Sequence, residues 1–439
     1  MKKKLKNSEK SYYRMVFQIL LFIVFTYSFE MWQLTDIHLD PMYTVGSDPL
    51  KLCREGKGNA GKYGDYSCDA NTALLDSLVK FIKRNTDVNG KVMVYNGDIV
   101  SRAIPKYNLD YVKQSIVNAT ALLKKFEDFF IIPMLGNHDV YPANQMAINS
   151  QWIFQFAAEQ FAPFLSQNAI ESFKHGGYYT MPFPAHLGIK VPLNAVVLNT
   201  VLYYNYNKQT MDSTDPLGQF EWFKTVMDGY RKTGQRAIVS MHICPGVAER
   251  FNYSDQLYPQ YNDRLVDSLA EYNDVILGVL CGHLHTDTFR ILSKGNKKVM
   301  AFIGPSVDTW LGTSPSIRKY DVGNGRGYMK EFKNYHFQLR PKKDKLKPKT
   351  TIKQPSDGFN KWKFNYGSSS EYGLKELSPK EFEILAARMD KDLQLFNKYH
   401  LHFRADTPGF NCKGNCKNNC MCAVRYPRQN EFANCVVWN

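Results

Sequence analysis

The stretch LGNHD, residues 135–139, comes directly after the apolar run FFIIPM, residues 129–134, which is typical of a buried strand. A turn explains Gly136 and Asn137, because glycine and asparagine tolerate the backbone conformations of tight turns. A turn does not explain an imidazole and a carboxylate, His138 and Asp139, placed immediately after them. Other strands of this chain end in the same kinds of side chain, so these strand ends decide both fold and function.

Five apolar runs are followed within a few residues by histidine, aspartate or asparagine. The other four are EMWQL from residue 30, KVMVYN from residue 91, RAIVSM from residue 236 and VILGVL from residue 275. Such runs predict buried strands, and NAVVLN from residue 194 predicts one more. The side chains after the five strands are Asp36 and His38, Asp98, Asn137 and His138, His242, and His283 and His285.

Helical patterns alternate with these strands, over residues 70–84, 109–126, 146–164, 216–230 and 261–272. This alternation predicts an α/β sandwich whose sheets are covered by helices. Strand-like pieces follow residue 286, and a further helix is predicted over 378–399. We expect a signal peptide over 1–28, a catalytic domain over 29–340, a basic linker over 341–365, and a C-terminal helical, cysteine-rich region over 366–439.

The residues at the strand ends suit two divalent cations. Open α/β sheets bind ligands at the carboxyl ends of their strands, so the five loops should converge. Imidazole, carboxylate and amide oxygen together favour zinc, with manganese or iron as alternatives, whereas calcium prefers oxygen ligands alone. Alternation in an extended Asp-x-His segment would point both side chains the same way. Asp98 is the expected bridge between the cations, and Gly97, Gly136 and Gly282 let the backbone approach them.

Each of these pieces has a structural explanation when it is taken alone. A Gly-Asp pair is usually a turn, Asp36 would serve as a helix cap, and His242 would serve as a core histidine with a hydrogen-bond partner. Five such pieces in chain order, each after an apolar strand, favour a metal site over five separate coincidences.

The N-terminal segment resembles an export signal: lysines precede the apolar stretch MVFQILLFIVF, and small residues follow it. The stretch is shorter than the roughly 20 apolar residues that span a bilayer, although an uncleaved signal-anchor is an alternative. Asn118 and Asn252 begin acceptor triplets for N-glycosylation, which takes place in the secretory lumen. The predicted location is therefore outside the cell or in the lumen of lysosomes or endosomes.

Cysteine usage agrees with an oxidising compartment. Five of the nine cysteines lie between positions 412 and 435. Such crowding favours disulfides over a zinc knuckle, because these cysteines match no common zinc spacing and no histidine lies among them.

The net charge of +15 is concentrated in MKKKLKNSEK, residues 1–10, and RPKKDKLKPKT, residues 340–350. Basic tracts bind nucleic acids or anionic lipids in some proteins. Here no nucleic-acid motif and no interleaved aromatic residues accompany them, so we expect a targeting leader and a solvated loop, and no nucleic-acid partner.

The order Asp-x-His, Gly-Asp, Gly-Asn-His-Asp, His and Gly-His-x-His resembles that of the calcineurin-like metallophosphoesterases. The stretches STDPLGQFEW, HICPG, GHLHTDTF and GPSVDTWLGTSPSIRKY are similar to the acid sphingomyelinase and sphingomyelinase-like phosphodiesterases. The resemblance covers about residue 30 to the C-terminus. It implies a four-layer α/β/β/α sandwich, two zinc ions, and hydrolysis of phosphodiesters by metal-activated water.

The resemblance also implies a role for each site residue. His138 would be the proton donor to the leaving group, and Arg102, Asn137 and His242 would contact substrate. One zinc would be held by Asp36, His38, Asp98 and His285, and the other by Asp98, Asn137, His242 and His283.

For the cysteines, the resemblance implies disulfides between Cys53 and Cys68, Cys412 and Cys416, and Cys422 and Cys435. Cys420 is then unpaired in the tail. Cys244 and Cys281 stand beside strand-end ligands, and we expect them to be buried free thiols.

Two departures from the family bear on substrate. Acid sphingomyelinases carry a saposin-like lipid-binding domain, and we expect none here because Asp36 follows the predicted signal almost directly. Relatives often place a histidine four residues after the bridging aspartate, where this chain has Arg102, a phosphate-binding residue and a poor proton donor. The leading expectation is hydrolysis of sphingomyelin to ceramide and phosphocholine by a monomer with peripheral membrane contact. Nucleotides or other small phosphoesters are the alternative substrates, and a non-catalytic receptor is the alternative class.

Overall fold

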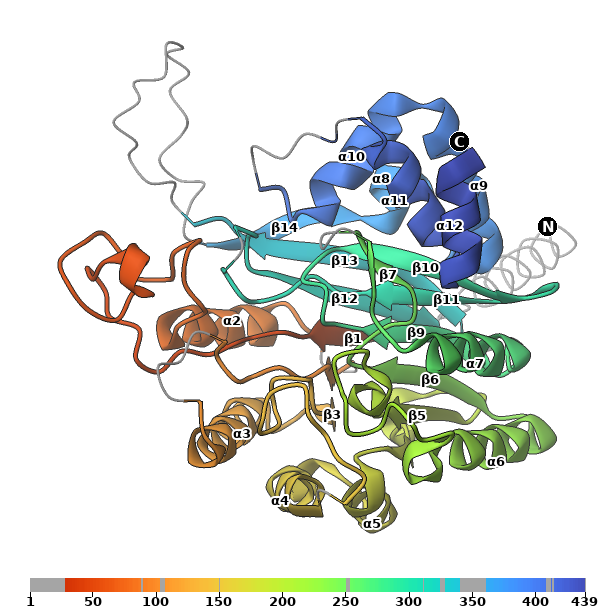
Figure 1. Cartoon of the computed structure of the whole chain (residues 1–439), viewed down its shortest axis with the longest axis horizontal. Helices are drawn as coiled ribbons and strands as arrows, with labels where there is room; N and C mark the ends of the chain where they lie inside the picture. The colour runs from red at the N-terminus through yellow and green to blue at the C-terminus, as the bar shows by residue number, and fades with distance from the viewer. Residues whose placement is uncertain are drawn as a thin grey trace, which may run out of the picture.

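A computed structural model describes residues 28–87, 90–102, 107–149, 151–249, 253–310, 312–323, 328–339, 361–407, 412 and 414–438. Residues 1–27 of the predicted signal peptide and residues 341–360 of the basic linker lie outside these residues, whereas Ser28 already belongs to the first strand. The described residues form two six-stranded sheets with helices packed around them, as Figure 1 shows. In this part of the chain, no helix has the length and apolar character needed to cross a bilayer.

The first sheet has the strand order β14-β13-β12-β1-β2-β3. β1, β2 and β3 run parallel, whereas β12, β13 and β14 continue the sheet as antiparallel neighbours. Its strands are β1 (Ser28–Leu34), β2 (Val92–Tyr95), β3 (Phe130–Pro133), β12 (Ser316–Gly323), β13 (Tyr328–Phe337) and β14 (Trp362–Gly367).

The second sheet has the order β10-β11-β9-β6-β5-β4. β5, β6, β9 and β11 are parallel, and the edge strands β4 and β10 are antiparallel to their neighbours. Its strands are β4 (Tyr179–Pro182), β5 (Leu193–Leu198), β6 (Arg236–Met241), β9 (Ile276–Cys281), β10 (Thr288–Lys294) and β11 (Lys297–Ile303). A separate two-stranded ladder joins β7 (Val247–Ala248) to β8 (Ser254–Asp255).

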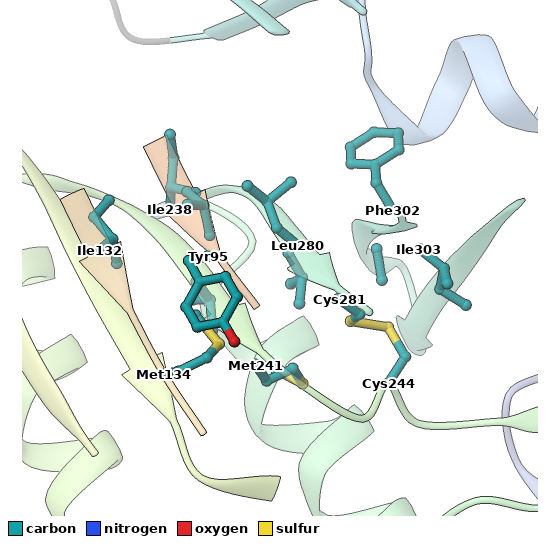
Figure 2. Packing of buried hydrophobic residues seen from close by; sticks show 14 of the residues in the cluster. Tyr95, Ile132, Met134, Ile238, Met241, Cys244, Leu280, Cys281, Phe302 and Ile303 are labelled. Atoms are coloured by element: carbon teal, nitrogen blue, oxygen red, sulfur yellow. A yellow bond between two sulfur atoms is a disulfide. The ribbon is translucent and has the colours of Figure 1, made fainter. Parts of the chain in front are cut away.

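Apolar side chains from both sheets form one core between them. Phe302 of β11 lies 5.9 Å from the ring of Tyr320 on β12 and 6.4 Å from that of Phe332 on β13. Figure 2 shows part of this core, with Tyr95 of β2 and Met134, directly after β3, near Met241 of β6. Because burying apolar surface contributes roughly 25 cal/mol per Å², this shared core holds the sheets together and fixes the positions of their strand ends.

The helices correspond well to the predicted ones, and α5 and β4 are additions that the sequence analysis did not predict. The helix predicted at 216–230 begins as a 3-10 turn and becomes α-helical only at Gln219. There the Asp215 carboxylate accepts hydrogen bonds from the backbone N–H groups of Phe220 (2.9 Å) and Glu221 (3.1 Å). The α-helices up to this point are α2 (Thr72–Arg84), α3 (Leu109–Lys124), α4 (Gln151–Phe161), α5 (Gln167–Gly176), α6 (Gln219–Thr233) and α7 (Pro259–Glu271). Short 3-10 turns are η1 (Pro49–Lys51), η2 (Ala162–Phe164), η3 (Ala185–Leu187), η4 (Thr200–Tyr203) and η5 (Pro216–Gly218).

The C-terminal helices gather at one end of the molecule (Figure 1). The helix predicted over 378–399 is two helices, because the carboxylate of Asp392 caps a new one by accepting from the N–H groups of Gln394 and Leu395. Residues 362–365, assigned above to the linker, belong to β14 and pair with β13. These helices are α8 (Ser368–Tyr372), α9 (Pro379–Lys391), α10 (Leu393–Phe403), α11 (Cys416–Arg425) and α12 (Gln429–Trp438).

Four disulfides are present in the described residues. Cys53 is joined to Cys68, Cys412 to Cys416 and Cys422 to Cys435, and these are the pairs that the resemblance implies. The expectation of free thiols at Cys244 and Cys281 is wrong, because these two residues form the fourth disulfide. Cys244 lies just beyond the end of β6, and Cys281 is the last residue of β9. The parallel pairing of these two strands brings the two sulfur atoms together. Cys420 is a buried free cysteine.

Candidate metal centre

The five loops that carry the predicted ligands meet where the two sheets come together. Asn96, at the end of β2, donates hydrogen bonds to the carbonyl of Met241 (2.9 Å) at the end of β6 and of Leu280 (3.1 Å) on β9. Gln33 of β1 donates to the carbonyl of Cys281 (2.8 Å). These buried bonds tie strand ends of one sheet to strand ends of the other, so the loops that follow converge.

A first ligand group consists of Asp36, His38 and His285. The Nε2 atom of His285 lies 3.2 Å from Oδ1 of Asp36 and 3.2 Å from Nε2 of His38. All three side chains are buried. An imidazole from each sheet and a carboxylate thus point at one small volume.

A second ligand group consists of Asn137, His242 and His283. Oδ1 of Asn137 lies 2.9 Å from Nε2 of His242 and 2.8 Å from Nδ1 of His283. Asp98 stands between the two groups, because its Oδ2 atom is 3.3 Å from Nε2 of His242 and 3.6 Å from Nε2 of His38. One carboxylate oxygen is therefore within reach of both groups.

The donor atoms fit divalent cations. Nδ1 of His38 bonds to the carbonyl of Val100 (2.7 Å), and Nδ1 of His242 bonds to the carbonyl of Asn96 (2.6 Å). Each Nδ1 must donate to its carbonyl, which leaves a lone pair on Nε2, as in histidines that bind metals. Oδ1 of Asp36 is buried without a hydrogen-bond partner. A cation would satisfy lone pairs that face one another here.

The backbone of the site is strained. Asp36, His38, Asp98, His283 and His285 all have positive φ, between 45° and 71°. Residues other than glycine rarely adopt this left-handed conformation, and they keep it only where the surrounding structure enforces it. The expectation of an extended Asp-x-His segment is therefore wrong, since tight turns and not strand alternation aim these side chains inward.

Two glycines allow the loops to approach one another. A Cβ atom at Gly136 would collide with the carboxylate of Asp98, and one at Gly282 would collide with the side chain of Thr35 and lie 2.6 Å from Oδ2 of Asp36. Any larger residue would push a predicted ligand out of place.

His138 and Asp139 have separate surroundings. The N–H of His138 donates to Oδ1 of Asp98 (2.8 Å), and its ring packs edge-on against His38, with 5.2 Å between the ring centroids. The Asp139 carboxylate accepts from the N–H groups of Asp98 (2.7 Å) and Gly136 (2.9 Å). Asp139 thus joins the loops after β2 and β3, while the His138 imidazole stays at the edge of the site.

Charge interactions within the site keep the Asp98 carboxylate ionised. Burial alone would raise the pKa of Asp98, but the adjacent His242 holds that pKa below the usual range of aspartate. Burial alone would lower the pKa of His242, and the Asp98 charge instead raises it to about 9. Burial and the neighbouring His242 lower the pKa of His283 to about 3. His283 is therefore already in the neutral form that binds metal, whereas His242 would release a proton on binding a cation.

Arg102, predicted to contact substrate, is held beside the first group. Its guanidinium forms an ion pair with Asp308, lies 3.6 Å from Oδ1 of Asp69, and packs 4.7 Å from the ring centroid of Trp310. Asp308 and Trp310 are not among the predicted site residues. Both residues lie in the stretch GPSVDTW, which carries part of the family resemblance. Their partner Arg102 lies about 200 residues earlier in the chain, so the sequence did not show the contact.

Tyrosines that the sequence did not predict as site residues lie beside His283 and beside His138. Tyr204 packs edge-on against His283 (5.1 Å between centroids), and the exposed Tyr206 packs on Tyr204 (5.2 Å). Tyr107 donates to the carbonyl of His138 (2.5 Å) and stacks with Tyr141, which is 38% exposed. Aromatic surface therefore lies on two sides of the predicted centre.

Of the two predicted glycosylation acceptors, the structure describes Asn118. Asn118 lies half-buried on α3 and accepts a hydrogen bond from Gln114. Asn252 lies outside the described residues. Modification of either asparagine stays a prediction.

Two family models match the chain. Residues 29–287, more than half of its length, match the calcineurin-like phosphoesterase model. Residues 331–439 match the model of the acid sphingomyelin phosphodiesterase C-terminal region. Together they cover the C-terminal helices and most strands of the two sheets, while β10, β11 and β12 lie between the two matches.

Curated relatives span the chain nearly from end to end. It is 29% identical to Sphingomyelinase phosphodiesterase C of Dictyostelium discoideum, over 99% of both chains. It is 28% identical to Cyclic GMP-AMP phosphodiesterase SMPDL3A of Mus musculus, over 93% of this chain and 91% of the relative. It is also 28% identical to Acid sphingomyelinase-like phosphodiesterase 3b of Mus musculus, over 93% and 90%. The chain belongs to the calcineurin-like phosphoesterase family, as an acid sphingomyelinase-like metal-dependent phosphodiesterase.

Proposed function

We propose that the centre holds two divalent cations, zinc in preference to manganese or iron, at the ligands that the resemblance implies. The observation that carries this proposal is the position of the Asp98 carboxylate between His38 and His242. Mixed imidazole, carboxylate and amide donors suit zinc. When bound, such cations activate water as a nucleophile and offset the charge that develops on the phosphoryl group. Asp36, His38, Asp98 and His285 would hold one cation, and Asp98, Asn137, His242 and His283 the other.

His138 is the proposed proton donor to the leaving group. Its backbone is anchored at both ends, since its N–H bonds to Asp98 and its carbonyl accepts from Tyr107. The imidazole is therefore fixed beside the ligands without being one of them. A general acid at that edge would protonate the departing oxygen.

Nucleotide-type phosphodiesters are the substrate class that the surroundings favour. Exposed Tyr141 and Tyr206 offer faces on which a nucleobase would stack, and Arg102 places a cation beside the first group. Base–aromatic stacking contributes roughly 1–3 kcal/mol per base. One relative is named as a cyclic GMP-AMP phosphodiesterase, which agrees with this class.

Sphingomyelin is the second candidate, and a different loop favours it. Met42, Val45 and Leu50 lie on the loop after His38, and they are 51%, 60% and 90% exposed. Apolar side chains in this position would contact a lipid surface, as an enzyme acting on membrane substrate requires. The name of one relative also points to this substrate.

Parallel assays separate the two candidates. We would measure initial rates on cyclic GMP-AMP, ATP and sphingomyelin dispersed in phosphatidylcholine vesicles, with Asp98→Asn as the inactive control. We expect nucleotide turnover to exceed sphingomyelin turnover at least tenfold. Sphingomyelin turnover well above nucleotide turnover would overturn the nucleotide assignment and leave the hydrolase assignment standing. No wild-type turnover of any phosphodiester would refute both.

Export through the secretory pathway is the location that the four disulfides support, because such bonds persist in oxidising compartments. We further propose a monomer without nucleic-acid partners. Light scattering of the purified chain would show one chain per particle, and a dimer mass would refute the monomer.

A further inference from the structure

Asp308 is a buried carboxylate that touches the first ligand group without belonging to it. Its Oδ2 atom lies 3.6 Å from Nδ1 of His285, on the side of the ring away from Asp36. The same oxygen forms the ion pair with Arg102. One atom therefore faces both a predicted ligand and a predicted substrate-binding side chain.

His285 differs from the other predicted ligands in this respect. His38 and His242 each bond through Nδ1 to a backbone carbonyl, which the strand ends hold in place. At His285 the Nδ1 atom faces the Asp308 carboxylate. A carboxylate in this position orients the ring of a metal-binding histidine and makes its other nitrogen a stronger donor.

The position of Asp308 is itself well determined. Its N–H donates to the carbonyl of Asp36 (3.0 Å), and its Oδ1 accepts from the N–H of Trp310 (3.2 Å). The side chain is fully buried. The Asp308 carboxylate is thus fixed relative to the first group and cannot follow a displaced His285.

Arg102 is held by the same constellation. Its backbone N–H donates to Oδ2 of Asp69 (2.8 Å), and its guanidinium lies between Asp308 and the face of Trp310. A flexible side chain that is paired and stacked in this way keeps its charge at one place beside the centre.

We propose that Asp308 is a positioning residue with two tasks: it orients His285 toward the first cation, and it holds the Arg102 guanidinium where substrate arrives. The first task rests on the proposed cation site, and the second on the proposed hydrolysis. Neither task follows from the predicted ligand set, which does not include Asp308.

The test is the Zn²⁺ affinity of the full chain after chelation, measured by calorimetric titration. We expect Asp308→Asn to weaken one of two Zn²⁺ affinities at least tenfold, since losing the carboxylate partner of a metal-binding histidine typically costs 10–100-fold. Glu249→Gln is the matched control, because Glu249 forms a buried ion pair with Arg290 (2.6 Å) outside the centre. The control should leave both affinities unchanged while lowering stability, and wild-type affinity in Asp308→Asn would overturn the first task.

A double variant separates positioning from simple charge balance. Arg102→Met removes a cation beside the centre, so on charge alone it would restore the affinity lost in Asp308→Asn. If Asp308 positions His285, the double variant stays at least tenfold weaker than the wild type. Full restoration would overturn the positioning role.

Arg102→Met alone serves as the second variant if Asp308→Asn fails to fold. We expect its Zn²⁺ affinity to be no weaker than wild type, while KM for ATP rises at least tenfold and kcat changes less. A tenfold loss of affinity, or an unchanged KM, would overturn the shared role of Asp308. Because Zn²⁺ affinity requires no turnover, a chain that binds Zn²⁺ as described yet hydrolyses nothing would refute the proposed function and not the orientation of His285.

Discussion

The two ligand groups lie next to each other but are stabilised in different ways. Around the first group, charged side chains predominate: Arg102 and Asp308 pair beside His285. Around the second group, Tyr204 packs on His283, and the Cys244–Cys281 disulfide joins the loops that carry His242 and His283. The comparison teaches that ion pairs position one half of the centre, whereas a covalent bond and aromatic packing position the other.

The largest effect should come from the residue common to both halves. We expect Asp98→Asn to lower kcat/KM by about 10³-fold or more, because it weakens both cation sites and each 1.36 kcal/mol of lost transition-state stabilisation is a factor of ten. The rates would be measured on bis(p-nitrophenyl) phosphate. Asp228→Asn, on the exposed face of α6, is the control and should match the wild type. Comparable rates in both variants would mean that Asp98 does not join the two groups.

His138 lies beside the first group, and its removal should affect chemistry and not metal content. We expect His138→Ala to lower kcat by roughly 10²–10⁴-fold on substrates with an alkoxide leaving group, the range usual for general acids. The loss should be far smaller on p-nitrophenyl esters, since p-nitrophenolate departs without a proton. Equal losses on both substrates would contradict the proton-donor role.

The disulfide beside the second group offers a comparison of stability. In the chain-entropy view, Cys244–Cys281, with a sequence separation of 37, contributes about 4 kcal/mol, and Cys53–Cys68, with a separation of 15, about 3 kcal/mol. We expect the paired alanine variants to lose stability in that order in urea unfolding. Replacing both Cys244 and Cys281 by alanine should also weaken Zn²⁺ binding, because the loops of His242 and His283 are then no longer joined covalently. If Zn²⁺ affinity is unaffected, packing alone holds the second group.

The smallest effect should come from the aromatic surroundings. Replacing Tyr141 by alanine should raise KM for ATP about tenfold, within the 1–3 kcal/mol assigned to stacking of a base. It should leave KM for bis(p-nitrophenyl) phosphate nearly unchanged. The matched variant carries serine at Met42, Val45 and Leu50, and it should change only the rate on sphingomyelin vesicles. If Tyr141→Ala left KM for ATP unchanged and lowered the rate on sphingomyelin vesicles, the lipid substrate would be favoured.

The parts that follow from local sequence were predictable. Apolar runs and helical patterns located most of the strands and helices, and the polar residues after the strands are the side chains that the fold brings together. The helix expected at 216–230 was located to within a few residues, because the Asp215 carboxylate that caps its first turn lies close by in the chain. The two family models then covered most of the same chain.

The parts that depend on distant partners were not predictable. Cys244 and Cys281 looked like core thiols, because nothing in either neighbourhood shows that strand pairing joins them. Asp308 has its partner 206 residues away, so no local pattern connects it with Arg102. The Asp-x-His segment was expected to be extended, whereas Asp36 and His38 adopt positive φ because neighbouring loops fix their turns. Tertiary contacts override local preference at these positions.

The central claim is that one carboxylate, Asp98, serves two cation sites. The most direct measurement is the metal content of the purified full-length chain, determined by elemental analysis for the wild type and for Asp98→Asn. We predict two zinc ions per wild-type chain, and at most one per variant chain after dialysis against dilute chelator. One zinc per wild-type chain at full activity, or two retained by Asp98→Asn, would contradict the account.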